Sequence, residues 1–177
     1  MKKTILTFGV ISGALSSLMM IATVPFMDRL DSDRGYLLGY TTIILSLLLV
    51  FFGVRSYRDN FSNGSISFGK AFLVGLAITV ISCLFYVFTW EIIYFKFMPD
   101  FMDKYGAQVI HKMQAAGATA AAIQEQADKL EKLKVMYKNP LINMAMTFLE
   151  PFPVGLLITL LTAAILRRKA PPQPKTA

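Results

Sequence analysis

Two acidic residues lie inside segments that are otherwise apolar. Glu91 occurs in "FTWEIIYF" and Glu150 in "TFLEPFPVGLL". Counting about 1.5 Å of helical rise per residue from the charged ends of these segments puts both acids in the outer quarter of a bilayer. Ionisable groups at such depth face protein or water rather than lipid. Both acids are therefore candidates for a polar site at membrane depth.

Two prolines follow Glu150 directly in the apolar segment, at Pro151 and Pro153. They lack the amide hydrogens that would bond the carbonyls of Thr147 and Leu149, so we expect the segment to kink or break there. The freed carbonyls need other helices, a hydroxyl such as that of Thr147, or water as partners. We predict that the break faces the helix bundle and holds Glu150 in a small, externally open, hydrated pocket that Glu91 can share. The alternative is a kink that only shapes the bundle, with Glu150 held by an arginine.

The acids have two competing roles. In the structural one, Glu91 pairs with Arg29, Arg34 or Lys96 at the outer membrane interface and holds helix ends together. In the functional one, the two acids bind a proton, an ion or a substrate. The candidate polar site is a set of six residues: Glu91, Glu150, Pro151, Pro153, Arg29 and Arg34.

Catalytic and metal-binding patterns are missing from the sequence. It contains no nucleotide-binding loop, CxxC, HExxH or GxSxG motif. His111 is the one histidine and is expected to be solvated, and Cys83 is the one cysteine, inside an apolar run. We therefore predict no metal site, no cofactor and no enzymatic activity.

The apolar residues that make up 55% of the 177 positions are concentrated in runs of membrane-spanning length. This predicts an all-α integral membrane protein with a single four-helix transmembrane domain over residues 1–169. The expected spans are 5–27, 36–54, 71–95 and 141–166, and residues 170–177 are expected to be a disordered tail. The first span is longer than the core of a secretory signal.

Charge placement orients the bundle. The formal net charge is +7, but the basic residues lie at the ends of the apolar runs, which is typical of topology determinants and not of nucleic-acid binding. The loop between spans 2 and 3 is the more basic of the first two loops. We expect that loop and both termini to be cytoplasmic.

Residues 96–139 then lie outside the membrane, and we expect them to form a helical hairpin. Apolar residues recur at helical spacing up to Met113, Gly117 interrupts the pattern, and a second helix starts near Thr119. Asn139 and Pro140 are suited to cap and begin the last span.

Small residues recur every fourth position in two spans. One stripe is Gly9, Gly13 and Ser17, and the other is Gly155, Thr159 and Ala163. Such stripes let helix backbones approach in lipid. Packing within the bundle is favoured over dimerisation, although the sequence of one chain leaves both open.

The sequence resembles the bacterial domain of unknown function 4199 family over nearly its whole length. The resemblance rests on "SFGKAFLVG", on "YVFTWEIIYFKFMPDF", on the helical insert and on the final "NPLINMAMTFLEPFPVGLLITLLTAAILRRK". It implies a multi-pass inner-membrane protein of Bacteroidetes-type bacteria without an established activity. From the residues we expect a non-enzymatic protein that contacts the lipid bilayer and a membrane-protein partner or a second copy of itself. The alternative is a small oligomeric transporter or proton-coupled carrier that uses Glu91 and Glu150.

Overall fold

A computed structural model describes residues 1–29 and 32–168, except for the side chains of residues 27–29 and 32. Within these residues the secondary structure is helical, apart from the connecting turns and one isolated bridge between Ile66 and Arg168. The side chain of Arg29 and the predicted tail at 170–177 lie outside the described parts.

The helices follow one another through the chain with short connections. Helix α1 (Lys2–Thr23) leads into a 3-10 turn, η1 (Val24–Arg29), and α2 (Ser32–Leu47) is followed at once by α3 (Leu49–Phe61). Helix α4 (Phe68–Ile92) continues into a π-helical turn, η2 (Ile93–Phe97). Then come α5 (Phe101–Ala115), α6 (Ala120–Tyr137), α7 (Pro140–Phe148) and α8 (Pro151–Leu166).

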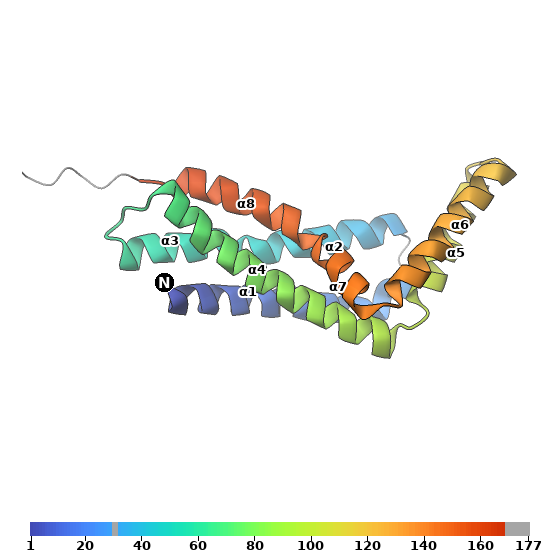
Figure 1. Ribbon diagram of the computed structural model, residues 1–177, viewed down its shortest axis with the longest axis horizontal. Helices are drawn as coiled ribbons and strands as arrows, with labels where there is room; N and C mark the ends of the chain where they lie inside the picture. Colours follow the sequence, from blue (N-terminus) through green and yellow to red (C-terminus); the bar gives the residue numbers. More distant parts are fainter. Residues whose placement is uncertain (30–31, 169–177) are drawn as a thin grey trace, which may run out of the picture.

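Four segments of the described chain are long and apolar enough to cross a membrane. They are Lys2–Phe26, Asp33–Phe61, Phe68–Phe97 and Pro140–Leu166. In Figure 1 they form an elongated bundle, with the start of α1 and the end of α8 at the same end. The hairpin of α5 and α6 projects from the opposite end at a steep angle to the bundle.

Local sequence explains where the hairpin helices begin and end. Gly117 adopts a positive φ of 74° after α5, a conformation that glycine adopts without strain. The Thr119 hydroxyl then accepts a hydrogen bond from the amide of Ala122, and the Asn139 side chain accepts one from Leu141 with Pro140 in the first turn of α7. The helical form of this insert and its capping residues are thus as predicted, whereas its position outside the membrane stays a prediction.

The first small-residue stripe packs α1 against α4. A Cβ atom at Gly9 would lie 2.9 Å from Ile81, and one at Gly13 would lie 2.6 Å from Phe85. At the third position of the stripe, the hydroxyls of Ser17 and Thr89 are hydrogen-bonded at 2.7 Å. The backbones therefore approach as closely as the sequence pattern predicts, and they do so within one chain.

The second stripe packs α8 against α4. A Cβ atom at Gly155 would lie 2.4 Å from the Thr79 methyl group, and the hydroxyls of Thr79 and Thr159 share a hydrogen bond of 2.9 Å. Leu47 and Ile78 are almost completely buried in the same core. Packing inside the bundle thus accounts for both stripes.

Candidate functional site

The last span is broken at the predicted position. Helix α7 ends at Phe148, and α8 begins at Pro151. The carbonyl of Thr147 accepts a hydrogen bond from the amide of Glu150 at 3.3 Å, which satisfies it within the break. The Thr147 hydroxyl instead donates to the Asn143 side chain at 3.1 Å.

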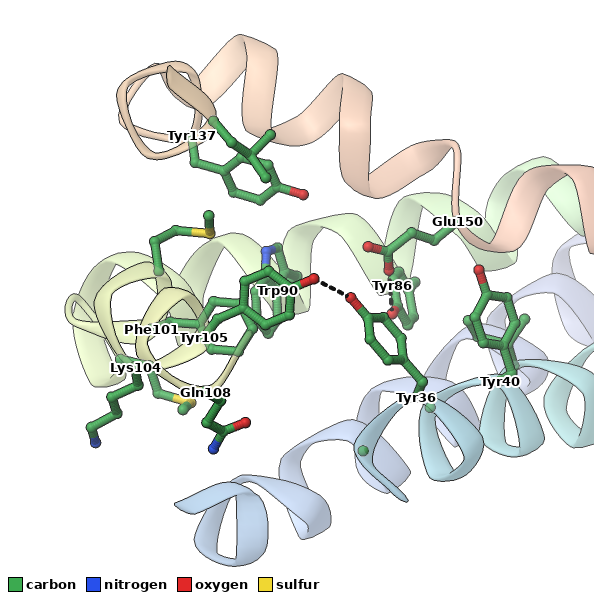
Figure 2. A pocket seen from close by; sticks show the side chains of 16 residues that line it. Tyr36, Tyr40, Tyr86, Trp90, Phe101, Lys104, Tyr105, Gln108, Tyr137 and Glu150 are labelled. Atoms are coloured by element: carbon green, nitrogen blue, oxygen red, sulfur yellow. Dashed lines mark hydrogen bonds between the residues drawn. The ribbon is translucent and has the colours of Figure 1, made fainter. Parts of the chain in front are cut away.

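A cavity of about 290 Å³ opens beside this break, between the bundle and the hairpin. Helices α2, α4, α5 and α6 contribute most of its wall, and Figure 2 shows their side chains converging on it. We call it the tyrosine pocket, because five of its lining residues are tyrosines. The described residues that line it are Gly35, Tyr36, Gly39, Tyr40, Ile43, Tyr86, Trp90, Met98, Phe101, Met102, Lys104, Tyr105, Gln108, Leu133, Tyr137 and Glu150.

Among the described residues of this lining, Glu150 is the one acidic residue. Its Oε2 accepts a hydrogen bond of 2.9 Å from the hydroxyl of Tyr86. Figure 2 shows the carboxylate pointing into the space beside Tyr36 and Tyr40. Among the described residues, a tyrosine rather than an arginine is the partner of Glu150, and the acid faces the tyrosine pocket.

Aromatic contacts build the wall that the hairpin contributes. The ring of Phe101 meets Trp90 edge-on with centroids 5.0 Å apart, and it stacks on Tyr105 at 6.3 Å. The hydroxyls of Tyr36 and Tyr105 are hydrogen-bonded at 2.7 Å, which joins α2 to α5 across the mouth of the cavity. Such rings combine a large apolar surface with a polar tip, and so they suit a site between membrane and water.

One ion pair joins the hairpin to α2 at this end, and another joins its two helices. Lys112 on α5 pairs with Asp33 at the start of α2, at 3.0 Å. Within the hairpin, Lys134 donates to Asp103, and this contact raises the pKa of Lys134 above its ordinary value. Burial and, next, the negative charge of Glu150 raise the pKa of Tyr137 to about 12.

The other predicted site residues lie elsewhere or cannot be placed. Glu91 is buried on α4 with 8% of its surface exposed, and it is not part of the pocket lining. Its Oε1 has no hydrogen-bond partner in the described part of the chain, so no pairing with Arg34 or Lys96 is seen. The side chain of Arg29 lies outside the described residues. The structure therefore brings Glu150 to the pocket, with Pro151 beside it at the start of α8 but outside the lining, and it does not bring Glu91 there.

Sequence reasoning missed most of the aromatic lining. Tyr36, Tyr40 and Trp90 are interpretable from sequence as a belt at the membrane interface. The spacing of Tyr36 and Tyr40, and of Tyr86 and Trp90, is four residues, which puts each pair on one helix face. That spacing is a signal for a shared aromatic surface, but it does not reveal that the two surfaces face each other around Glu150.

Over the described residues, these features define an all-helical protein with four helical segments of membrane-spanning length and an aromatic pocket to which Glu150 contributes a carboxylate. Residues 7–168 match the family described as "Protein of unknown function (DUF4199)", and the chain belongs to this family. Comparison with curated proteins and with solved structures finds no similar protein.

Proposed function

We propose that this protein is a non-enzymatic, multi-pass membrane protein that binds a small, partly apolar ligand in the tyrosine pocket. The observation that carries the proposal is the cavity of about 290 Å³ at the junction of bundle and hairpin, whose described lining residues provide a single carboxylate in a mostly aromatic wall. Ligand sites are typically concave and apolar, with a few polar groups that fix orientation. Their usual volumes begin near 300 Å³, which favours a small ligand.

The composition of the lining supports binding over catalysis. Glu150 is held by a tyrosine hydroxyl, and Lys104 pairs with Asp100 at 3.2 Å. Acyl or phosphoryl transfer needs a nucleophile with an adjacent base, or a metal. The polar side-chain groups of the described lining residues are phenols, an indole N–H, an amide, one amine and one carboxylate, an assortment suited to recognition.

The proposed location is a bacterial cytoplasmic membrane, with both termini in the cytoplasm and the hairpin outside. The excess of Lys and Arg near residues 55–70 supports this orientation. Reporter fusions should place residue 62 and the C-terminus inside and residue 120 outside. An external signal from the C-terminal fusion would overturn this orientation.

Pocket occupancy can be followed through Trp90, which is the only tryptophan of the chain and lies in the pocket wall. N-phenyl-1-naphthylamine, a neutral apolar dye, serves as probe and as acceptor for Trp90 emission. Gly39→Leu should fill the pocket, since a Cβ at this lining residue meets no atom within 4 Å. Gly69→Leu is the matched control, because Gly69 is equally unobstructed and lies outside the pocket.

Full-length protein in neutral detergent micelles is titrated with the dye. Energy transfer from Trp90 should saturate in wild type and in Gly69→Leu, and it should fall several-fold in Gly39→Leu. Micelle partitioning of the dye contributes equally to all three proteins and cancels in the comparison. Identical curves for the three proteins would reject ligand binding in this pocket.

A small oligomeric transporter or proton-coupled carrier is the second candidate. It is favoured by the broken last span and by the buried Glu91 carboxylate, because broken helices and intramembrane acids are common at transport sites. Flux into proteoliposomes that is the same for wild type and Glu150→Gln would remove Glu150 from such a role. Chemical cross-linking in native membranes tests the proposed membrane partner or second copy, and recovery of monomers alone would count against both.

A further inference from the structure

We infer that the ligand of the tyrosine pocket is an organic ammonium ion, whose charged group lies against Glu150 and the rings of Tyr36, Tyr40 and Tyr86. This inference rests on the proposed binding function and specifies the ligand class of the same site. It follows from the charge of the lining, from the faces of the rings and from the chemistry that the site disfavours.

The first step concerns charge. The Glu150 carboxylate accepts one hydrogen bond, from Tyr86, and none of the described basic residues forms an ion pair with it. Among the described lining residues Lys104 is the basic one, but its amine pairs with Asp100, which directly precedes α5, and points away from Glu150 in Figure 2. The region around Glu150 therefore presents negative charge to a ligand.

The second step concerns the rings. Tyr36 and Tyr40 keep 53% and 45% of their surface exposed, although they line a cavity. Figure 2 shows both rings, with that of Tyr86, beside the Glu150 carboxylate. Aromatic faces attract a cation within about 6 Å of the ring centre, and cages of such rings are suited to quaternary ammonium groups. The carboxylate and the rings thus favour the same kind of charge.

The third step excludes other ligand classes. An anion would be repelled by Glu150, and a neutral ligand would cover the carboxylate without neutralising it, which is unfavourable away from water. A metal ion generally needs several strong donors. No cluster of three or more His, Cys, Asp or Glu side chains that could hold a metal occurs among the residues that the structure describes. An organic cation satisfies both the acid and the aromatic wall.

Two sources supply this chemistry at a membrane: a free amine or a lipid headgroup. The pocket lies beside the start of α2 and the end of α4, at one end of two candidate membrane spans. Both a free amine and a lipid headgroup can reach this position. The size of the cavity suits a headgroup-sized cation in either case. The experiment is therefore built on the headgroup chemistry itself.

The probes are choline and 3,3-dimethyl-1-butanol, which have nearly the same shape and differ in charge. Binding to full-length protein in neutral micelles is followed by Trp90 fluorescence. We expect choline to bind at least about tenfold more tightly than its neutral analogue, as an ion pair with cation–π contacts should provide. Glu150→Gln should remove most of this preference. Glu125→Gln is the control, because Glu125 pairs with Lys129 on the exposed face of α6.

A second variant guards against misfolding of the first. Tyr40→Leu changes a partly exposed ring and should weaken choline binding several-fold, while binding of the neutral analogue stays the same. Nanodiscs then separate the two sources. If a lipid headgroup occupies the pocket, choline should bind more weakly to protein in phosphatidylcholine discs than to protein in phosphatidylglycerol discs. If the ligand is a free amine, choline should bind equally in both kinds of disc.

Equal affinities for choline and the neutral analogue in wild type would overturn the ammonium inference. The same result would leave the pocket itself intact, provided that Gly39→Leu still weakens dye binding. If Gly39→Leu also binds the dye like wild type, the proposed binding function fails as well. A choline preference that survives in both Glu150→Gln and Tyr40→Leu would place the cation elsewhere and overturn the inference.

Discussion

On the side that faces α2 and the last span, the two ends of α4 are packed in opposite ways. Around Gly75 and Thr79 its neighbours are a glycine and a threonine of α8, and a Cβ atom at Gly155 would collide with Thr79. Around Tyr86 and Trp90 its neighbours are rings from α2 and the hairpin, and a cavity of about 290 Å³ lies between them. We call these regions the closed end and the open end.

The difference shows how one apolar helix can serve two purposes. Small residues let backbones approach, so the closed end is held by short contacts and hydroxyl pairs. Large rings hold the helices apart at the open end, and the break at Pro151 redirects the last span there. The ligand site thus lies where the close packing of α8 on α4 stops, whereas α1 stays packed against α4 at the same level through Gly13 and Ser17.

The largest expected effect comes from removing the break. Changing Pro151 and Pro153 together to alanine should join α7 and α8 into one helix, since proline is about 3 kcal/mol less favourable than alanine inside a helix. Glu150 would then leave Tyr86, and dye binding should fall several-fold without a loss of thermal stability. Helical content by circular dichroism and the Trp90 titration measure the two effects. Unchanged dye binding in a protein with a continuous helix would show that the open end does not depend on the break.

A methyl group at the closed end should be costly to stability. Gly155→Ala puts a Cβ atom 2.4 Å from the Thr79 methyl group, and Thr79 is fixed by its bond to Thr159. We expect a loss of about 1–3 kcal/mol, typical of overpacking. Thermal unfolding in detergent provides the measurement. Gly69→Ala, which meets no atom within 4 Å, is the control and should be as stable as wild type or slightly more so.

A smaller effect is expected from deleting one hydroxyl at the closed end. Thr159→Val keeps the shape of the side chain and removes its hydrogen bond to Thr79. Interhelical hydrogen bonds in membranes contribute about 0.6 kcal/mol on average, so the melting temperature should fall slightly. Dye binding at the open end should be unchanged. A variant that binds the dye much more weakly would show that the two ends are coupled.

The smallest effect appears only in strong alkali. Because the folded protein raises the pKa of Tyr137 from an ordinary value of about 10 to about 12, the unfolded tyrosine loses its proton first. Tyr137 should therefore contribute a loss of stability as the pH rises from about 10 to about 12. The absorbance of tyrosinate, taken as wild type minus Tyr137→Phe, should have its midpoint near 12. Glu150→Gln should lower that midpoint, whereas a midpoint of about 10 in wild type would contradict the burial of this ring.

The sequence alone determined the features that depend on neighbouring residues. Apolar runs of sufficient length predicted the four candidate spans, and the missing amides of Pro151 and Pro153 predicted the break between α7 and α8. The positions of Thr119 and Asn139 predicted helix starts, because capping involves residues only two or three positions apart. The small-residue stripes predicted close helix contacts, because residues four positions apart lie on one face of the same helix.

Only the tertiary structure decided which helix faces meet. Counting residues from the span ends places Glu91 and Glu150 at similar depths in a bilayer, yet of the two only Glu150 lines the pocket. The reason is that the rotation of each helix about its axis sets where a side chain points. The contact of Tyr86 with Glu150 joins residues 64 positions apart, and that of Tyr36 with Tyr105 joins residues 69 positions apart. Helical periodicity gives the face of each residue within its own helix, whereas the partner of that face depends on the packing of the whole bundle.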